Sequence, residues 1–264
     1  MTDDVLRHEM YESAAILTMN RPDRRNALNR ELGERLIEAL TEVGRDPEVR
    51  CVVLTGAGGA FCAGDDLDAV ADFLAGDRSS GPADEVTGDS HYLRVCEAMV
   101  RCPKPVIAGV DGVAAGAGTE LACAADYRMA SDRARIGSML VRVGHFGTAV
   151  LLPRVVGPSR ATEIYLTGRL VEADEAERIG LVHTVVPATE FQASLRALAR
   201  TLAQGPTKSI AYFKELREAA WGQPVEYGLR LQDLYHIRSH TEIADAEEGP
   251  RAFLEGREPV FGGG

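Results

Sequence analysis

The sequence lacks several features that mark specialised classes of protein. None of its five cysteines, at positions 51, 62, 96, 102 and 123, forms a C-x-x-C pair, and the odd count with wide spacing predicts free thiols in a reducing compartment. No stretch approaches the roughly 18 consecutive apolar residues of a membrane span. The N-terminus, Met-Thr-Asp-Asp-Val, has no apolar run of the kind found in signal or transit peptides. We therefore expect a cytoplasmic protein that does not interact with membranes.

Positive charge is also scarce. The chain has 29 Lys and Arg against 40 Asp and Glu, which gives a formal net charge of −11. Such an acidic surface argues against a general nucleic-acid partner, although a local basic spot could still bind a phosphate. With 264 residues, 45% of them hydrophobic, the chain can form one large domain, or a domain with an appendage, around a sizeable core.

The hydrophobic pattern predicts an α/β fold. Strands are expected at 15–19, 51–55, 106–110, 127–130 and 181–186, and helices lie between them. One helix should begin after an N-cap at Asn29 and end at Gly44, and Ser159 should cap another that runs to about Leu166. Helices are expected at 90–101 and, after Thr189, throughout the remainder, with breaks at 205–206 and 222–224. We therefore divide the chain into an α/β core (1–187) and a C-terminal helical region (188–264).

Two segments have less regular expected roles. Residues 76–89 are rich in Gly, Ser, Asp and Pro, and predict a mobile surface loop. The Leu/Ala stripe in 191–202 is expected to be core or a subunit interface.

The segment from Gly109 to Asp126 is the most informative part of the chain. It follows an apolar strand, and it packs glycine and alanine into a turn before it opens a helix. A helix that begins on small residues leaves backbone N–H groups uncovered, and these can stabilise negative charge on an oxygen. Glu120 follows Ala117 by three residues, so both face the same side of the helix. An oxyanion donor and a carboxylate base in one small volume predict enolate chemistry next to a carbonyl.

Six segments in order resemble the crotonase superfamily, the enoyl-CoA hydratase/isomerase family: 20–28 (NRPDRRNAL), 61–67 (FCAGDDL), 112–121, 166–169, 176–182 and 252–261. The resemblance covers nearly the whole chain. It implies an α/β spiral of ββα units with a C-terminal helical trimerisation region that also completes the active site. It further implies an acyl-CoA substrate, no metal or redox cofactor, and a homotrimer or homohexamer.

The resemblance also implies roles for particular residues. The oxyanion donors would be the backbone N–H groups of Asp65 and Ala117, and Glu120 would be one of two glutamates that position and activate water. Glycines 64 and 118 beside the donors would allow close approach of the substrate. The substrate-binding and CoA-binding set would comprise Arg24, Arg25, Ala27, Ala63, Asp65, Asp66, Leu67, Gly116, Ala117 and Leu140. Arg24 and Arg25 would lie near the CoA phosphates, and Asp66 could also cap the helix that begins near Leu67.

The chain departs from the family pattern at the second glutamate. The aligned residue is Leu140, which cannot transfer a proton, and the following loop, 144–148, is shorter than the usual pattern. We hypothesise that His145 lines the acyl pocket and replaces the missing carboxylate. The alternative is a histidine on a loop or at a trimer contact.

These observations favour an enoyl-CoA hydratase. The alternatives within the family are an isomerase or other thioester chemistry such as hydrolysis or decarboxylation. A Rossmann oxidoreductase is disfavoured, because the turn after the strand at 51–55 has Phe61 where G-x-G-x-x-G needs glycine. A binding subunit that has lost its chemistry stays open, with Leu140 as its best support. His236 and His240 lack the adjacent glutamate of an H-E-x-x-H site, so no metal is expected.

Overall fold

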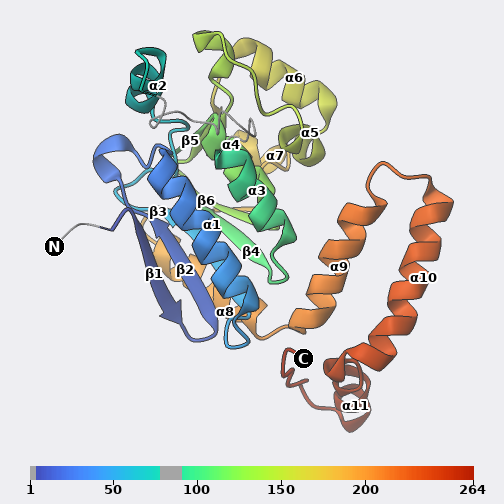
Figure 1. The fold of residues 1–264 in the computed structure, drawn as a ribbon. Coiled ribbons are helices and arrows are strands. Elements are labelled where there is room, and N and C mark those ends of the chain that lie inside the picture. Colours follow the sequence, from blue (N-terminus) through green and yellow to red (C-terminus); the bar gives the residue numbers. More distant parts are fainter. Residues whose placement is uncertain (1–3, 78–90) are drawn as a thin grey trace.

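The computed structural model describes residues 4–77 and 91–264 (Figure 1). Its strands are β1 (Leu6–Tyr11), β2 (Ala14–Met19), β3 (Cys51–Gly56), β4 (Val106–Val110), β5 (Val113–Ala115), β6 (Tyr127–Ser131), β7 (Arg135–Gly137), β8 (Val171–Glu172) and β9 (Thr184–Val186). The α-helices are α1 (Arg30–Arg45), α2 (Leu67–Leu74), α3 (His91–Arg101), α4 (Ala117–Ala124), α5 (Leu151–Val156), α6 (Pro158–Thr167), α7 (Ala173–Arg178), α8 (Phe191–Ala203), α9 (Thr207–Ala220), α10 (Val225–Glu242) and α11 (Glu248–Glu255). Short 3-10 helices occur at η1 (Pro22–Arg24), η3 (Leu140–Val143) and η4 (Ala244–Ala246).

Six strands form the central sheet, in the order β1-β2-β3-β4-β6-β9. Strands β1 and β2 pair antiparallel, and every later pair in this sheet is parallel. The carboxyl ends of parallel strands meet at one edge of a sheet. The segments that follow β3 and β4 therefore leave from the same edge, which brings the two glycine-rich motifs together.

A second, smaller sheet has the order β5-β7-β8. Strands β4 and β6 lie in the large sheet, whereas β5 and β7, which directly follow them, pair with each other in the small one. Isolated parallel bridges pair Leu28 with Asp65 and Cys62 with Ala114. Each β-β pair is followed by helical structure, so the predicted ββα architecture is confirmed.

The sequence alternation of the central strands sets which helix covers which face. Val52 and Leu54 of β3 belong to the cluster that includes α1, α3 and α4, while Cys51 and Val53 belong to the cluster built on α8. Side chains two apart in a strand share a face, so α8 packs on the face opposite α1. The Leu/Ala stripe of α8 is thus core, with Phe191, Leu195, Ala199 and Ala203 buried.

Most local expectations are confirmed, and three need correction. Asn29 caps α1, because its side chain accepts from the Leu32 N–H. Gly44, however, lies inside α1, which ends at Arg45. Ser159 is also inside its helix: the N-cap of α6 is Gly157 (φ 78°), followed by Pro158 at the first helical position. The strand predicted at 181–186 is shorter, since β9 begins at Thr184.

Three further expectations concern the cysteines, the loop and membranes. All five cysteines are free and buried. Residues 78–89 of the predicted surface loop lie outside the described residues. None of the described helices combines the length and apolar character needed to cross a bilayer.

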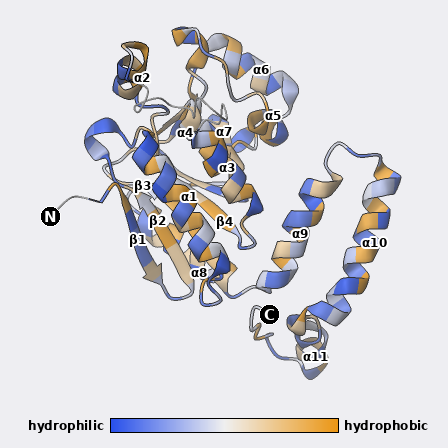
Figure 2. Cartoon of the chain, viewed as in Figure 1, coloured by the Kyte–Doolittle hydropathy of each residue, from blue (hydrophilic) through white to orange (hydrophobic). Residues whose placement is uncertain are grey.

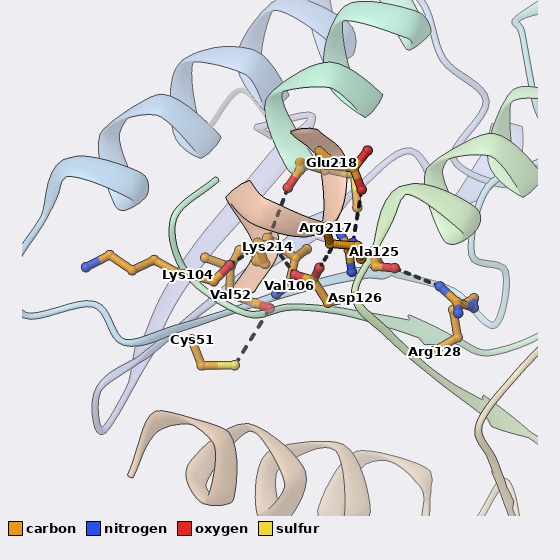
Figure 3. Close-up of polar contacts among 11 residues, drawn as sticks. Cys51, Val52, Lys104, Val106, Ala125, Asp126, Arg128, Lys214, Arg217 and Glu218 are labelled. Atoms are coloured by element: carbon orange, nitrogen blue, oxygen red, sulfur yellow. Dashed lines mark hydrogen bonds and ion pairs between the residues drawn. The ribbon is translucent and has the colours of Figure 1, made fainter. Parts of the chain in front are cut away.

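Helix α9 joins the core through buried polar contacts (Figure 3). Lys214 is 3% exposed, pairs with Asp126 and donates to the Lys104 carbonyl at 2.9 Å. Asp126 also pairs with Arg217 at 3.2 Å and accepts from the Val106 N–H at 2.9 Å. The side chain of Asp126 therefore holds α9 against the start of β4.

Beyond α9, the chain leaves the body of the molecule. Helices α9, α10 and α11 lie to one side of the two sheets (Figure 1), and Figure 2 shows hydrophobic residues along α10. Large apolar side chains stay exposed there: Phe213, Trp221, Val225, Leu229, Leu234, Ile237, Phe253 and Leu254.

Candidate active site

Two backbone segments that follow β3 and β4 adjoin each other. A Cβ placed on Gly118 would lie 2.1 Å from the Cys62 carbonyl oxygen, and one on Gly64 would lie 2.9 Å from that of Ala115. The contact is therefore backbone to backbone, and only glycine permits it at these two positions. Thr119 fixes the first turn of α4 to β7, because its hydroxyl donates to the Gly137 carbonyl at 2.8 Å and accepts from the Gly137 N–H at 3.1 Å.

The two predicted oxyanion donors lie on these segments. The Leu28 N–H donates to Gly64 O at 2.7 Å and the Asp66 N–H donates to Leu28 O at 2.9 Å, so this pairing bypasses the Asp65 N–H. Ala117 is the first residue of α4, after Gly116 (φ 53°), and no side chain caps this helix. An amide in the first turn has no partner within its own helix. The Ala117 amide is thus left without a partner in its helix, whereas the Asp65 amide contacts the carboxylate of its own side chain.

A pocket of about 400 Å³ opens beside these segments. It is lined by nine of the predicted site residues: Arg24, Ala27, Ala63, Asp65, Asp66, Leu67, Gly116, Leu140 and His145. Arg25 does not line it; its side chain is exposed, and its carbonyl accepts from the Ala63 N–H at 3.0 Å. Glu120 and Ala117 are not among the lining residues; both are buried in α4, which directly follows Gly116 of the lining.

Glu120 is held in an apolar surrounding. Its residue is 4% exposed, and burial raises the pKa of its carboxyl, while a hydrogen bond with the Thr148 backbone partly opposes that rise. In the described part of the chain, its Oε2 is buried without a hydrogen-bond partner. Thr148 has φ 55°, a conformation rare for a β-branched residue, so the shortened loop bends sharply where it meets Glu120. A buried carboxylate with a free oxygen is suited to bind and deprotonate water.

Leu140 and His145 also line the pocket. The Leu140 side chain would be 3.4 Å from a Cβ on Gly116, so an apolar group lies directly beside the amide pair. The His145 backbone is fixed by its N–H to Leu140 O at 2.9 Å and by the Tyr165 hydroxyl, which donates to its carbonyl at 3.0 Å. The His145 residue itself is exposed at the pocket.

Charged side chains also line the pocket. Arg24 is exposed and pairs with Asp68. Asp66 caps α2 by accepting from the Asp68 N–H at 3.1 Å, as predicted, and it also pairs with Arg21 at 2.7 Å.

Sequence reasoning missed three residues near the site: Arg21, Tyr92 and Thr148. Arg21 could have been found from its place in the Asn20–Leu28 motif, but Tyr92 and Thr148 carry no local signal. Burial raises the pKa of the Tyr92 hydroxyl to about 12, and the Glu120 and Asp65 carboxylates add to the rise, so Tyr92 lies near both.

No group of three or more His, Cys, Asp or Glu side chains among residues 4–77 and 91–264 could hold a metal ion. His236 and His240 contact each other on α10, with ring centroids 4.8 Å apart, away from the pocket residues.

The two-sheet spiral, with an amide pair beside a buried carboxylate, is the arrangement expected of a crotonase-type enzyme. The sequence profile described as enoyl-CoA hydratase/isomerase matches residues 9–264. The chain therefore belongs to the enoyl-CoA hydratase/isomerase family, within the crotonase superfamily, and is an enzyme of that family.

Individual relatives agree with this assignment. The chain is 36% identical to an enoyl-CoA hydratase of Mycobacterium tuberculosis over 253 residues, which cover 93% of this chain and 92% of the relative. It is 35% identical to the 1,2-epoxyphenylacetyl-CoA isomerase of Escherichia coli over 271 residues and all of both chains. The crystal structure of an enoyl-CoA hydratase from Bacillus anthracis matches with a TM-score of 0.87 and 30% identity, covering 98% of this chain and 100% of that one.

Proposed function

We propose that this protein is an enoyl-CoA hydratase that adds water across the double bond of a 2-enoyl-CoA. The observation that carries the proposal is Glu120, a buried carboxylate on the same helical turn as the amide of Ala117, with one oxygen that has no partner among residues 4–77 and 91–264. Relatives with the same printed activity cover nearly the whole chain. The reaction needs a CoA thioester and water, and we propose no separate cofactor.

The proposed chemistry uses the amide pair and the Glu120 carboxylate together. The N–H groups of Asp65 and Ala117 donate to the thioester oxygen. Glu120 takes a proton from water as the water oxygen bonds to Cβ, and the π electrons move toward the thioester, which becomes an enolate. The two amides stabilise this charge, and loss of one such donor typically costs on the order of 100- to 1000-fold in rate. A proton delivered to Cα then completes the 3-hydroxyacyl-CoA.

The CoA moiety is assigned to the charged part of the pocket lining. Arg24 belongs to this lining, where a cation favours binding of the CoA phosphates, and Arg25 is exposed on the same turn. Ala27, Ala63, Asp66 and Leu67 supply the backbone and short side chains along which the adenine and pantetheine would lie.

The test is the loss of conjugated-thioester absorbance with a short and a medium 2-enoyl-CoA. Wild type should turn over, and Glu120→Gln should lose activity by about 100-fold or more, because a positioned base typically contributes 10²–10⁴. Glu48→Gln is the matched control, since Glu48 is exposed on the loop before β3, and it should behave as wild type. Equal turnover by Glu120→Gln and wild type would sink the assignment of the base.

Isomerisation of a 3-enoyl-CoA is the second candidate. The observation that favours it is Leu140, which offers no proton where a family hydratase has its second glutamate. An isomerase needs only one group to move a proton from Cα to Cγ. Formation of the conjugated thioester from 3-enoyl-CoA, without hydration of 2-enoyl-CoA, would select this function.

The helical region 188–264 is proposed to build a homotrimer, or a homohexamer formed by two such trimers. The exposed apolar residues of α9–α11 support this, because a patch of Phe253 and Leu254, each 85% exposed, is costly in water. Light scattering should give the mass of three or six chains, and Phe253→Asp should reduce it. A monomeric wild type would contradict the proposal.

A further inference from the structure

The contacts within the fold do not explain why residue 65 carries a carboxylate, because only its backbone amide has been given a role so far. The neighbouring Asp66 carboxylate is fully used, since it caps α2 and pairs with Arg21. The Asp65 carboxylate lines the pocket, and in the described part of the chain its one hydrogen-bonding contact is with its own backbone. Within the described residues this half-buried carboxylate therefore ties together no two elements of the fold, so a structural role does not account for it.

Covalent geometry places this carboxylate near the reacting atoms. A thioester oxygen held by the Asp65 N–H lies roughly 3 Å from that nitrogen. The carboxyl carbon of an aspartate is itself only about 3–4 Å from its own backbone nitrogen, because three bonds separate them. The carboxyl carbon therefore lies within about 7 Å of the thioester oxygen, a range that includes the neighbouring Cα of the substrate.

The surroundings shift this carboxyl toward its protonated form. Burial raises its pKa, and nearby His145 partly opposes the rise. Tyr92 on α3 and Glu120 on α4 face the same volume, as the raised pKa of Tyr92 records, and neither brings positive charge. An ionised carboxylate beside a developing oxyanion would repel it, whereas a protonated one can donate.

We propose that the Asp65 side chain is the second acid/base group of this enzyme, exchanging a proton with Cα of the thioester and replacing the carboxylate absent at Leu140. In hydration, the O–H bond of the Asp65 carboxylic acid breaks, a C–H bond forms at Cα, and the enolate electrons restore the thioester carbonyl. The proton that Glu120 took from water then returns through solvent to Asp65, so the net change is addition of one water. His145 adjoins Asp65 as a positioning residue in this assignment.

The inference rests on the proposed function, and its test is chosen to be independent of hydration. Wild type is incubated in D₂O with a saturated acyl-CoA, which has no double bond to hydrate, and deuterium at Cα is followed by mass spectrometry. Removal of the Cα proton by ionised Asp65 gives the same enolate, so wild type should exchange. Asp65→Asn and Asp65→Ala should exchange at least 100-fold more slowly, while Glu120→Gln should retain exchange.

Three further measurements make the result decisive. Far-UV circular dichroism and urea unfolding should match wild type for both Asp65 variants, which shows that they fold. Asp72→Asn, an exposed aspartate on α2, removes one charge nearby and should exchange as wild type does. The hydration assay is run in parallel, so exchange without hydration would end the proposed function and leave Asp65 in place.

Two outcomes would overturn the assignment of Asp65. One is wild-type exchange in the Asp65 variants with loss of exchange in Glu120→Gln. The other is a wild type that binds CoA and does not exchange.

Discussion

Gly118→Ala should separate the two oxyanion donors without touching a catalytic side chain. The new Cβ would lie 2.1 Å from the Cys62 carbonyl oxygen and 2.9 Å from the carbonyl carbon. Carbon atoms make ordinary contacts at about 3.5–4.0 Å, so the two backbones must move apart by more than about 1 Å. No flexible side chain can give way, because the obstacle is main chain.

The expected cost follows from that displacement. Cys62 and Asp65 are on one short segment and Gly118 follows Ala117, so the shift moves one N–H away from the other. A 1 Å misplacement can cost on the order of 100-fold, and loss of one donor costs about 100- to 1000-fold. Forced overpacking should also lower the free energy of unfolding by about 1–3 kcal/mol.

The assay is kcat/KM for hydration of a 2-enoyl-CoA, with urea unfolding measured on the same preparation. Gly249→Ala on α11 is the matched control, since a Cβ there meets no atom within 4 Å. It should leave kcat/KM unchanged and alter stability by no more than about 1 kcal/mol. A folded Gly118→Ala enzyme within threefold of wild-type kcat/KM would refute the reasoning.

Three other predictions concern α9, the base and the CoA site. Lys214→Ala should lower the free energy of unfolding by about 1–3 kcal/mol in urea titrations, because it removes a buried charge-assisted contact while Asp126 keeps Arg217 and the Val106 N–H. Lys208→Ala on the same helix should change it by less than about 1 kcal/mol. Burial raises the pKa of Glu120, so its folded state binds a proton more tightly than the unfolded chain. The free energy of unfolding should therefore fall as pH rises from the ordinary value of 4.5 through the raised pKa, and Glu120→Gln should remove this loss. The value of kcat/KM should fall as pH drops through the same raised pKa, because the base must be ionised. A fall in kcat/KM only at or below pH 4.5 would contradict a buried base. Arg24→Ala should raise KM about tenfold, or about 1.4 kcal/mol, with kcat little changed; an unchanged KM would remove Arg24 from the CoA site.

The central elements were predictable because their signals are local. Strand β4 has five buried residues in a row, and its bounds are as the sequence predicts. The Asn29 cap and the small-residue start of α4 each depend on a few adjacent residues. These segments fix the turn geometry that puts Glu120 beside the amide pair.

The missed elements depend on contacts that sequence does not display. Strand β1 was not predicted, because four of its six residues are exposed and it lies at the sheet edge. Gly44 does not end α1, which runs to Arg45, and a Cβ on Gly44 would lie 3.4 Å from Pro103. At α6, Pro158 at the first helical position was an available signal, and it is stronger than Ser159 as a mark of the helix start.

Some residues of the site were predictable from the sequence, and others were not. The family motifs led to nine residues that line one pocket. The neighbours of Glu120 and Asp65, namely Thr148 and Tyr92, are set by the packing of α3 and the shortened loop against α4, and no pattern along the chain encodes that packing.

The most direct test of the account is incorporation of solvent oxygen into product. Purified enzyme is incubated with a 2-enoyl-CoA in ¹⁸O-labelled water, and the acyl-CoA products are weighed by mass spectrometry. The account predicts 3-hydroxyacyl-CoA with one labelled oxygen from wild type, formed at least about 100-fold more slowly by Glu120→Gln. A wild type that binds CoA and incorporates no label, or a Glu120→Gln variant that incorporates it at the wild-type rate, would contradict it.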